Sequence, residues 1–213
     1  MDRSSNKSSS KKSSSKKSPT QPDAIAVLKA DHRRVSDLFD DFEQLGDRAH
    51  TTRRRTVGKI IEELSRHAAI EENVLYPAVR DRLASRDQAG AMVLEALEEH
   101  HVVKVLLQEL ERMEPTAERY VAKVTVLREI VDHHVDEEES ELFANVREVF
   151  SRSELRDLGA RLEAARQSAP MRPHPSAPDE PPASTVATVL TAPLDAAADL
   201  TTRAGEVVRS AVG

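Results

Sequence analysis

The sequence predicts an all-α protein: an antiparallel up-down-up-down four-helix bundle with a short fifth helix and disordered tails. The composition favours helices, because tryptophan is absent, aromatic residues make up 3% and there are only six glycines. Apolar residues recur at steps of three and four along four long segments. The 213 residues suffice for one domain with a sizeable core plus tails.

The first two helices are expected at about residues 23–45 and 51–83. The stretch "SPTQPD" precedes the first of them and Gly46 follows it, as expected of helix start and stop signals. Pro77 lies inside the second segment, where we expect it to bend the helix.

Three further helices follow. The third is expected at about residues 87–113, because the Glu114-Pro115 pair stops it, and the fourth at about 116–150. Ser151 and Glu154 have capping-box spacing, which predicts a shorter fifth helix reaching about residue 167.

The segments outside the expected helical domain, residues 21–167, differ in composition. Residues 1–20 are a Ser/Lys-rich basic tail that we expect to be disordered. Such a tail suits contact with nucleic acid, polyphosphate or an anionic membrane surface; the alternative is that it only aids solubility. Residues 168–185 form a proline-rich linker, and residues 186–213 a C-terminal tail with a weak amphipathic pattern.

Several classes of protein and site are excluded or disfavoured. The chain has no cysteine, which excludes disulfides, thiolate metal sites and a cysteine nucleophile. It has neither a run of about 18 apolar residues for a membrane span nor an apolar signal region at its N-terminus. We therefore expect a soluble, cytoplasmic protein.

The apolar stripes contain polar residues at unexpected positions. In the second expected helix the stripe passes through Leu64, His67, Glu71 and Val74, so a histidine and a glutamate one turn apart interrupt a buried face. Every long helix has a histidine in its stripe, and two have a glutamate four residues later: His32, His67, Glu71, His100, His134 and Glu138.

The same pattern occurs twice. "HAAIEENVLYPAV" at residues 67–79 aligns with "HVDEEESELFANV" at 134–146, and "DHRRVSDLF" at 31–39 aligns with "EHHVVKVLL" at 99–107. With a rise of about 1.5 Å per residue, each of the four histidines lies some 20–25 Å from the turn of its hairpin. In the expected bundle all six polar side chains therefore meet in one layer.

A layer of this kind predicts a metal site. Buried carboxylates must be paired, protonated or bound to a cation. Imidazole and carboxylate without thiolate suit iron, manganese or zinc. Two central carboxylates between two histidine pairs predict two bridged ions, with positions left for an oxo or hydroxo bridge and a small ligand. Iron is the preferred metal, and zinc or manganese are the alternatives.

The H…HxxxE…H…HxxxE arrangement over about residues 23–150 resembles the hemerythrin-like, or HHE cation-binding, domain family. The resemblance implies an antiparallel four-helix bundle around a non-haem di-iron centre, in proteins that bind or sense O₂ and NO, handle peroxide, or store iron. It also implies the six ligands given above. Oxygen carriers of the family have a fifth histidine where this chain has Lys104, which argues against simple reversible O₂ carriage.

Some assignments have alternatives. His101 and the His133–Glu137 pair lie beside the preferred residues and are candidates for a fifth ligand or a proton relay. Glu72 and Glu139 are expected to lie around the ligands or in solvent. Tyr76, about one turn after Glu71, is either a hydrogen-bond donor to a bound ligand or a core residue.

Three functions are compatible with the sequence. The first is a di-iron protein that binds or senses a small ligand, O₂, NO or peroxide, in stress response or iron handling. The second is an enzyme that degrades hydrogen peroxide at the same centre. The third is a metal-independent helical interaction module that contacts nucleic acid through its basic tail. The six-residue cluster favours the first two, and the sequence leaves open whether the protein is an enzyme.

Overall fold

The computed structural model describes residues 21–83 and 87–177, and within these ranges the chain is helical without any strand. The predicted all-α bundle is confirmed. The predictions for residues 1–20 and 186–213, a disordered basic tail and a weakly helical C-terminal tail, fall outside the described residues.

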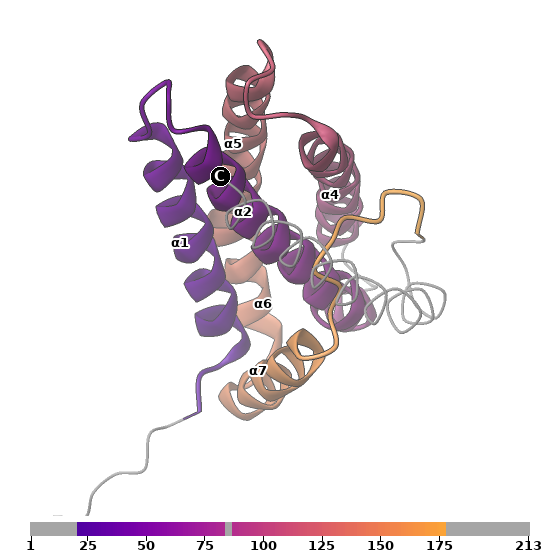
Figure 1. The fold of residues 1–213 in the computed structure, drawn as a ribbon. Coiled ribbons are helices and arrows are strands. Elements are labelled where there is room, and N and C mark those ends of the chain that lie inside the picture. The colour runs from indigo at the N-terminus through magenta and orange to yellow at the C-terminus, as the bar shows by residue number, and fades with distance from the viewer. Residues whose placement is uncertain (1–20, 84–86, 178–213) are drawn as a thin grey trace, which may run out of the picture.

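Four long helices make the bundle: α1 (Ala24–Glu43), α2 (His50–Ile70), α4 (Asp87–Arg112) and α5 (Tyr120–Glu137). The turns from α1 to α2 and from α4 to α5 lie at the same end of the bundle, as the up-down-up-down topology requires (Figure 1). Helix α1 packs against α2 and α4 against α5, and further contacts join α2 with α4 and α1 with α5. Helix α7 (Arg152–Arg166) lies across the opposite end.

Two of the four long helices, α2 and α5, continue through a π-helical segment into a further helix, and each such continuous series is called a rod below. After α2 follow η1 (Glu71–Leu75) and α3 (Tyr76–Arg82), and after α5 follow η2 (Glu138–Leu142) and α6 (Phe143–Val149). The sequence predicted continuous helices, with a bend at Pro77. Pro77 lies in the first turn of α3, directly after the π-helical segment η1. The irregularity therefore begins six residues earlier, at Glu71.

The helix ends follow their capping residues. The Asp23 side chain accepts a hydrogen bond from the Ala26 backbone N–H at 2.8 Å and starts α1. Ser151 and Glu154 form the predicted capping box at the start of α7. Helix α5 begins at Tyr120, later than predicted, because most of residues 115–119 form turns.

The core consists of two apolar clusters along the bundle. The cluster nearer α7 includes Leu28, Leu75 and Phe143, and the cluster nearer the hairpin turns includes Phe39, Ile60 and Leu127. Between them the buried side chains are polar: His32, His67, Glu71, His100, His134 and Glu138. The polar layer thus interrupts the core at one level, as the repeat predicted.

The first part of the proline-rich segment follows the domain surface. Residues 168–177 have no helix, and Ala169, Pro170 and Pro173 are buried. Arg172 forms an ion pair with Glu111 of α4. Among the described residues, no helix combines the length and apolar character needed to cross a membrane.

We expect Gly159→Ala to destabilise the fold. A Cβ at Gly159 of α7 would lie 2.6 Å from the Pro22 carbonyl oxygen and 2.9 Å from the Ala24 nitrogen. These are backbone atoms, so relief requires α7 to shift away from α1, at a cost of about 1–3 kcal/mol of unfolding free energy. Urea denaturation measures the change.

Gly58→Ala is the matched control for this substitution. Gly58 is exposed on α2 and has no atom within 4 Å of the added Cβ. The control should stabilise the protein by up to about 1 kcal/mol, since alanine is the better helix former. Equal effects of the two substitutions would contradict the close packing of α7 on α1.

Candidate metal centre

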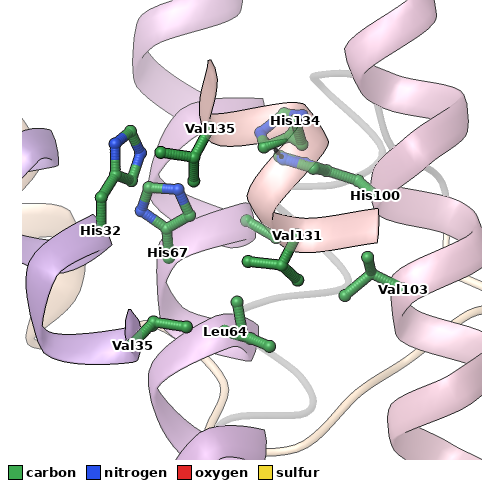
Figure 2. Close-up of a pocket in the computed structure, with 10 residues that line it drawn as sticks. His32, Val35, Leu64, His67, His100, Val103, Val131, His134 and Val135 are labelled. Atoms are coloured by element: carbon green, nitrogen blue, oxygen red, sulfur yellow. Dashed lines mark hydrogen bonds between the residues drawn. The ribbon is translucent and has the colours of Figure 1, made fainter. Parts of the chain in front are cut away.

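The six polar residues of the layer come from every long element of the bundle. His32 lies on α1 and His100 on α4, whereas His67 and His134 lie in the last turns of α2 and α5. Glu71 and Glu138 are the first residues of η1 and η2. All six are at most 6% exposed. Figure 2 shows the four histidine side chains directed from separate helices toward the same interior space.

The histidines form two pairs, and each glutamate contacts both pairs. The rings of His32 and His67 are 4.9 Å apart, and those of His100 and His134 are 4.8 Å apart. Glu71 Oε2 lies 3.1 Å from His67 Nε2 and 3.4 Å from His100 Nε2. Glu138 Oε2 lies 3.5 Å from His32 Nε2 and 3.9 Å from His134 Nε2. Both carboxylates therefore connect the two histidine pairs.

A second carboxylate lies behind each histidine, on its Nδ1 side. His32 Nδ1 is 2.9 Å from Glu139 Oε1, His100 Nδ1 is 3.0 Å from Glu72 Oε1, and His134 Nδ1 is 2.8 Å from Glu99 Oε2. His67 Nδ1 lies farther from its carboxylate, at 3.6 Å from Asp31 Oδ2. For His32, His100 and His134, an Nδ1–H donated to the carboxylate leaves Nε2 as an acceptor facing the centre, the arrangement found behind metal-binding histidines.

The two π segments bring an aromatic residue next to the site. The backbone N–H of Tyr76 donates to the Glu71 carbonyl, and that of Phe143 to the Glu138 carbonyl, both with five-residue spacing. The Tyr76 hydroxyl donates to Glu138 Oε1 at 3.1 Å. In the second repeat Phe143 stacks on His32 with a ring separation of 5.9 Å. The repeats therefore differ here: one aromatic residue has a hydroxyl and the other does not.

The two central carboxylates oppose each other electrostatically. Burial raises the pKa of Glu71 well above its usual range, and the negative charge of Glu138 raises it further. Burial also acts to raise the pKa of Glu138, but the neighbouring His32, 3.5 Å away, and the charge of His134 outweigh it, so this pKa is lowered. Without a cation, one carboxyl of the pair is therefore favoured as the protonated form.

Burial also affects the histidines. It lowers the pKa of His67 well below its usual range, and the charge of His32 adds to this effect; burial likewise lowers the pKa of His100. For His134 burial acts in the same direction, but the hydrogen bond with Glu99 outweighs it and the pKa is raised. Neutral imidazoles keep a nitrogen lone pair for a metal ion.

The residues fit a metal cation. Among the described residues, His32 Nε2, Glu71 Oε1 and Glu138 Oε2 are buried atoms with no hydrogen-bond partner. Each such atom costs about 1–3 kcal/mol when nothing satisfies it. Ligand atoms lie within 4.8 Å of one another in two overlapping groups, one of His32, His67, Glu71 and Glu138 and one of Glu71, His100 and His134.

The alternative ligands from the sequence lie elsewhere. His101 is exposed, and His133, with 64% of its side chain exposed, pairs with Glu137 at 3.3 Å. Neither lines the cavity at the centre. Glu72 contacts His100 and Glu139 contacts His32, so both lie around the candidate ligands, one of the two positions expected for them.

Lys104, at the position where the resemblance implies a fifth histidine in oxygen carriers, is buried. Its Nζ lies 2.8 Å from Glu72 Oε2, so it contacts the carboxylate that holds His100.

Sequence reasoning gave no role to Asp31 and Glu99. Each directly precedes a histidine of the repeat, yet each faces the histidine of the neighbouring helix, His67 or His134. The sequence feature that pointed to these two residues was the acidic residue at the start of both "DHRRVSDLF" and "EHHVVKVLL". Only the packing of the helices shows which histidine each acid meets.

A small apolar cavity adjoins the histidines. Its volume is about 20 Å³, enough for one or two water-sized molecules. Besides the four histidines, it is lined by the apolar side chains of Val35, Leu64, Ala68, Val103, Val131 and Val135 (Figure 2). The cavity offers a small, uncharged ligand a place beside the centre.

Comparison with known proteins identifies relatives of the whole domain. Residues 23–146 match the family model of the hemerythrin HHE cation binding domain. An uncharacterized hemerythrin-like protein of Schizosaccharomyces pombe is 29% identical over 175 residues, which cover 82% of this chain and 84% of that protein. A DNA nickase of a Nostoc species is 32% identical over 146 residues, 68% of this chain but 40% of the relative.

A solved structure has the same fold. It is the crystal structure of a hemerythrin HHE cation binding domain-containing protein from Mycobacterium kansasii. The two chains are 26% identical, with a TM-score of 0.58, and the match covers 69% of this chain and 89% of the other.

We expect Lys104→Met to destabilise the protein more than Lys29→Met. Lys104 and Glu72 form a buried ion pair, and removal of one partner from such a pair costs about 3–5 kcal/mol. Lys29 makes the corresponding contact with Glu139, but both side chains are about one-third exposed, so its loss should cost less than about 1 kcal/mol. Urea denaturation measures the unfolding free energy of both variants. Equal losses of unfolding free energy would contradict the importance of the burial of Lys104.

Proposed function

The chain belongs to the hemerythrin HHE cation-binding family, and from this premise we propose that it holds a carboxylate-bridged pair of iron ions that binds or senses a small ligand. The ligand classes are O₂, NO and peroxide. The single observation that carries the proposal is the pair of buried glutamates, each of which contacts one histidine of either pair, next to an apolar cavity.

The proposed ligands are the six residues of the layer. His32 and His67 would hold one ion and His100 and His134 the other, with Glu71 and Glu138 placed between the two pairs. Support comes from the Nε2 atoms that face the two glutamates, and from the unsatisfied oxygen on each glutamate. Bound cations compensate the two buried carboxylates at once, which a single proton cannot do.

The choice of iron rests on the donor set and on the cavity. Imidazole nitrogen and carboxylate oxygen suit iron, manganese and zinc alike. When bound, an iron pair supplies open coordination positions and the redox chemistry that O₂, NO and peroxide require. The apolar cavity at the histidines excludes charged molecules, which would lose hydration there, and admits a small neutral one.

The outer carboxylates fix the geometry of the proposed centre. Glu139, Glu72 and Glu99 accept hydrogen bonds from His32, His100 and His134, which sets the ring orientation and keeps each Nε2 free to bind. Lys29 and Lys104 neutralise two of these carboxylates, so that the outer negative charge does not compete for the ions.

A second candidate function is the breakdown of hydrogen peroxide at the same centre. The observation that favours it is the buried Tyr76 hydroxyl, 3.1 Å from Glu138 Oε1 and 3.4 Å from His100 Nε2. Burial raises the pKa of Tyr76 well above its usual range, so the phenol stays protonated and is able to donate a hydrogen bond to a peroxide oxygen. Evolution of O₂ from added hydrogen peroxide separates this candidate from ligand binding alone.

His67→Ala and Glu138→Ala should each remove metal from the purified protein. Each substitution deletes one proposed ligand and leaves the facing groups buried without compensation. We expect metal content, measured by plasma mass spectrometry, to fall from two ions per chain to one or none. His101→Ala, an exposed neighbour of His100, is the control and should retain both ions. Full occupancy in the first two variants would exclude these residues as ligands.

Val103→Ile should weaken ligand binding without loss of metal. The added methyl group enters the cavity of about 20 Å³ and fills most of it. We expect NO affinity of the iron-loaded protein, followed by visible absorption, to fall at least tenfold. Val102→Ile on the same helix is 46% exposed and should bind NO as the unmodified chain does. An unchanged affinity in Val103→Ile would place the ligand outside this cavity.

A further inference from the structure

A second pocket, acidic rather than apolar, reaches the same centre from another direction. It has a volume of about 70 Å³ and lies between α4 and the α5–η2 rod. Six titratable side chains line it: Glu95, Glu99, His134, Glu137, Glu138 and Glu141. Met92, Ala96 and Leu142 complete the wall, and in the part of the chain that the structure describes no lysine or arginine lines this pocket.

The burial of these side chains increases from the mouth inward. Glu95 and Glu141 are exposed, Glu99 and Glu137 are partly buried, and Glu138 is 3% exposed. The pocket therefore connects solvent with a proposed bridging carboxylate. Glu138, which lines the inner end of the pocket, has one oxygen, Oε2, without a hydrogen-bond partner among the described residues.

A group of potential ligand atoms lies at the edge of the pocket, where the exposed His133 contacts the lining residues Glu99 and Glu137. Glu99, His133 and Glu137 each offer one atom, and these atoms lie within 4.8 Å of one another. His133 Nε2 is 3.3 Å from Glu137 Oε1 and 3.8 Å from Glu99 Oε1. The other oxygen of Glu99 holds His134, so this group adjoins the centre through one residue.

The apolar cavity offers no comparable route for a cation. Apart from the histidines, its lining is made of aliphatic side chains, and a hydrated ion would lose its water there without replacement ligands. The acidic pocket provides carboxylate oxygens at each depth, so that water can be exchanged for protein ligands one step at a time.

We propose that the acidic pocket between α4 and the α5–η2 rod is the path by which a divalent cation enters and leaves the centre, with Glu99, His133 and Glu137 as its first binding position. The centre thus has two entrances of different chemistry. The metal ion enters through the acidic pocket, and the small neutral ligand enters through the apolar cavity. This inference rests on the proposed cation centre.

The exchange of resident iron for isotopically enriched ferrous iron tests the path. The metal-loaded protein is incubated anaerobically with the enriched ion, and bound isotopes are measured by mass spectrometry. Glu95→Gln/Glu141→Gln removes two exposed carboxylates at the mouth. Because these carboxylates offer ligands to the ion that leaves as well as to the ion that enters, we expect exchange to slow about tenfold, and we expect the effect to be smaller at high salt.

Glu118→Gln/Glu129→Gln is the matched control, because it changes the net charge equally at exposed positions outside the pocket. Exchange in this control should match that of the unmodified protein, and all three proteins should hold the same number of ions. Equal exchange rates in the two double variants would overturn the path and leave the proposed function intact. An unmodified protein without bound metal would overturn the proposed function itself.

His133→Asn tests the first binding position separately. His133 is 64% exposed and lies outside the core, so we expect the variant to fold and load fully but exchange iron several-fold more slowly. His101→Asn, another exposed histidine, is the control. Exchange as fast as in the control would remove His133 from the path.

Discussion

The main constraint on this fold is the free-energy cost of burying two carboxylates in one layer of its helical core. Glu71 and Glu138 are almost fully buried between two apolar clusters, and the contacts from four histidines leave each with an oxygen unsatisfied. The pKa of Glu71 is raised and that of Glu138 is lowered, which favours one protonated and one charged carboxyl when no cation is bound. Cations at this layer remove the conflict, so metal binding and the stability of the bundle are coupled.

The charged residues around the centre compensate one another outward from the two buried carboxylates. Carboxylates behind the histidines orient the imidazoles, and Lys29 and Lys104 offset two of those carboxylates at the outside. Histidines, carboxylates and lysines therefore follow one another from the centre outward. Two pockets interrupt this arrangement. On one side aliphatic residues border a cavity of about 20 Å³, and on the other glutamates line a pocket of about 70 Å³. The two pockets that reach the centre therefore differ in chemistry as well as in size.

The sequence predicted the fold because each helix has a clear apolar period and recognisable ends, and the repeated H…HxxxE pattern placed six polar residues at one depth. The π segments could not be predicted, because the same residues fit a continuous α-helix and Pro77 was the more obvious irregularity. The outer partners of the histidines could not be predicted either. Asp31 and Glu99 contact residues on neighbouring helices, and these contacts depend on helix rotation, which periodicity leaves undetermined.

The most direct test of the central claim is an anomalous-scattering map of crystals of the iron-loaded protein, with the metal content of the same sample. Our account predicts two iron peaks per chain, both between the His32–His67 and His100–His134 pairs and joined by Glu71 and Glu138. A single peak, or peaks confined to surface carboxylates, would contradict it, and the buried histidines would then have a purely structural role.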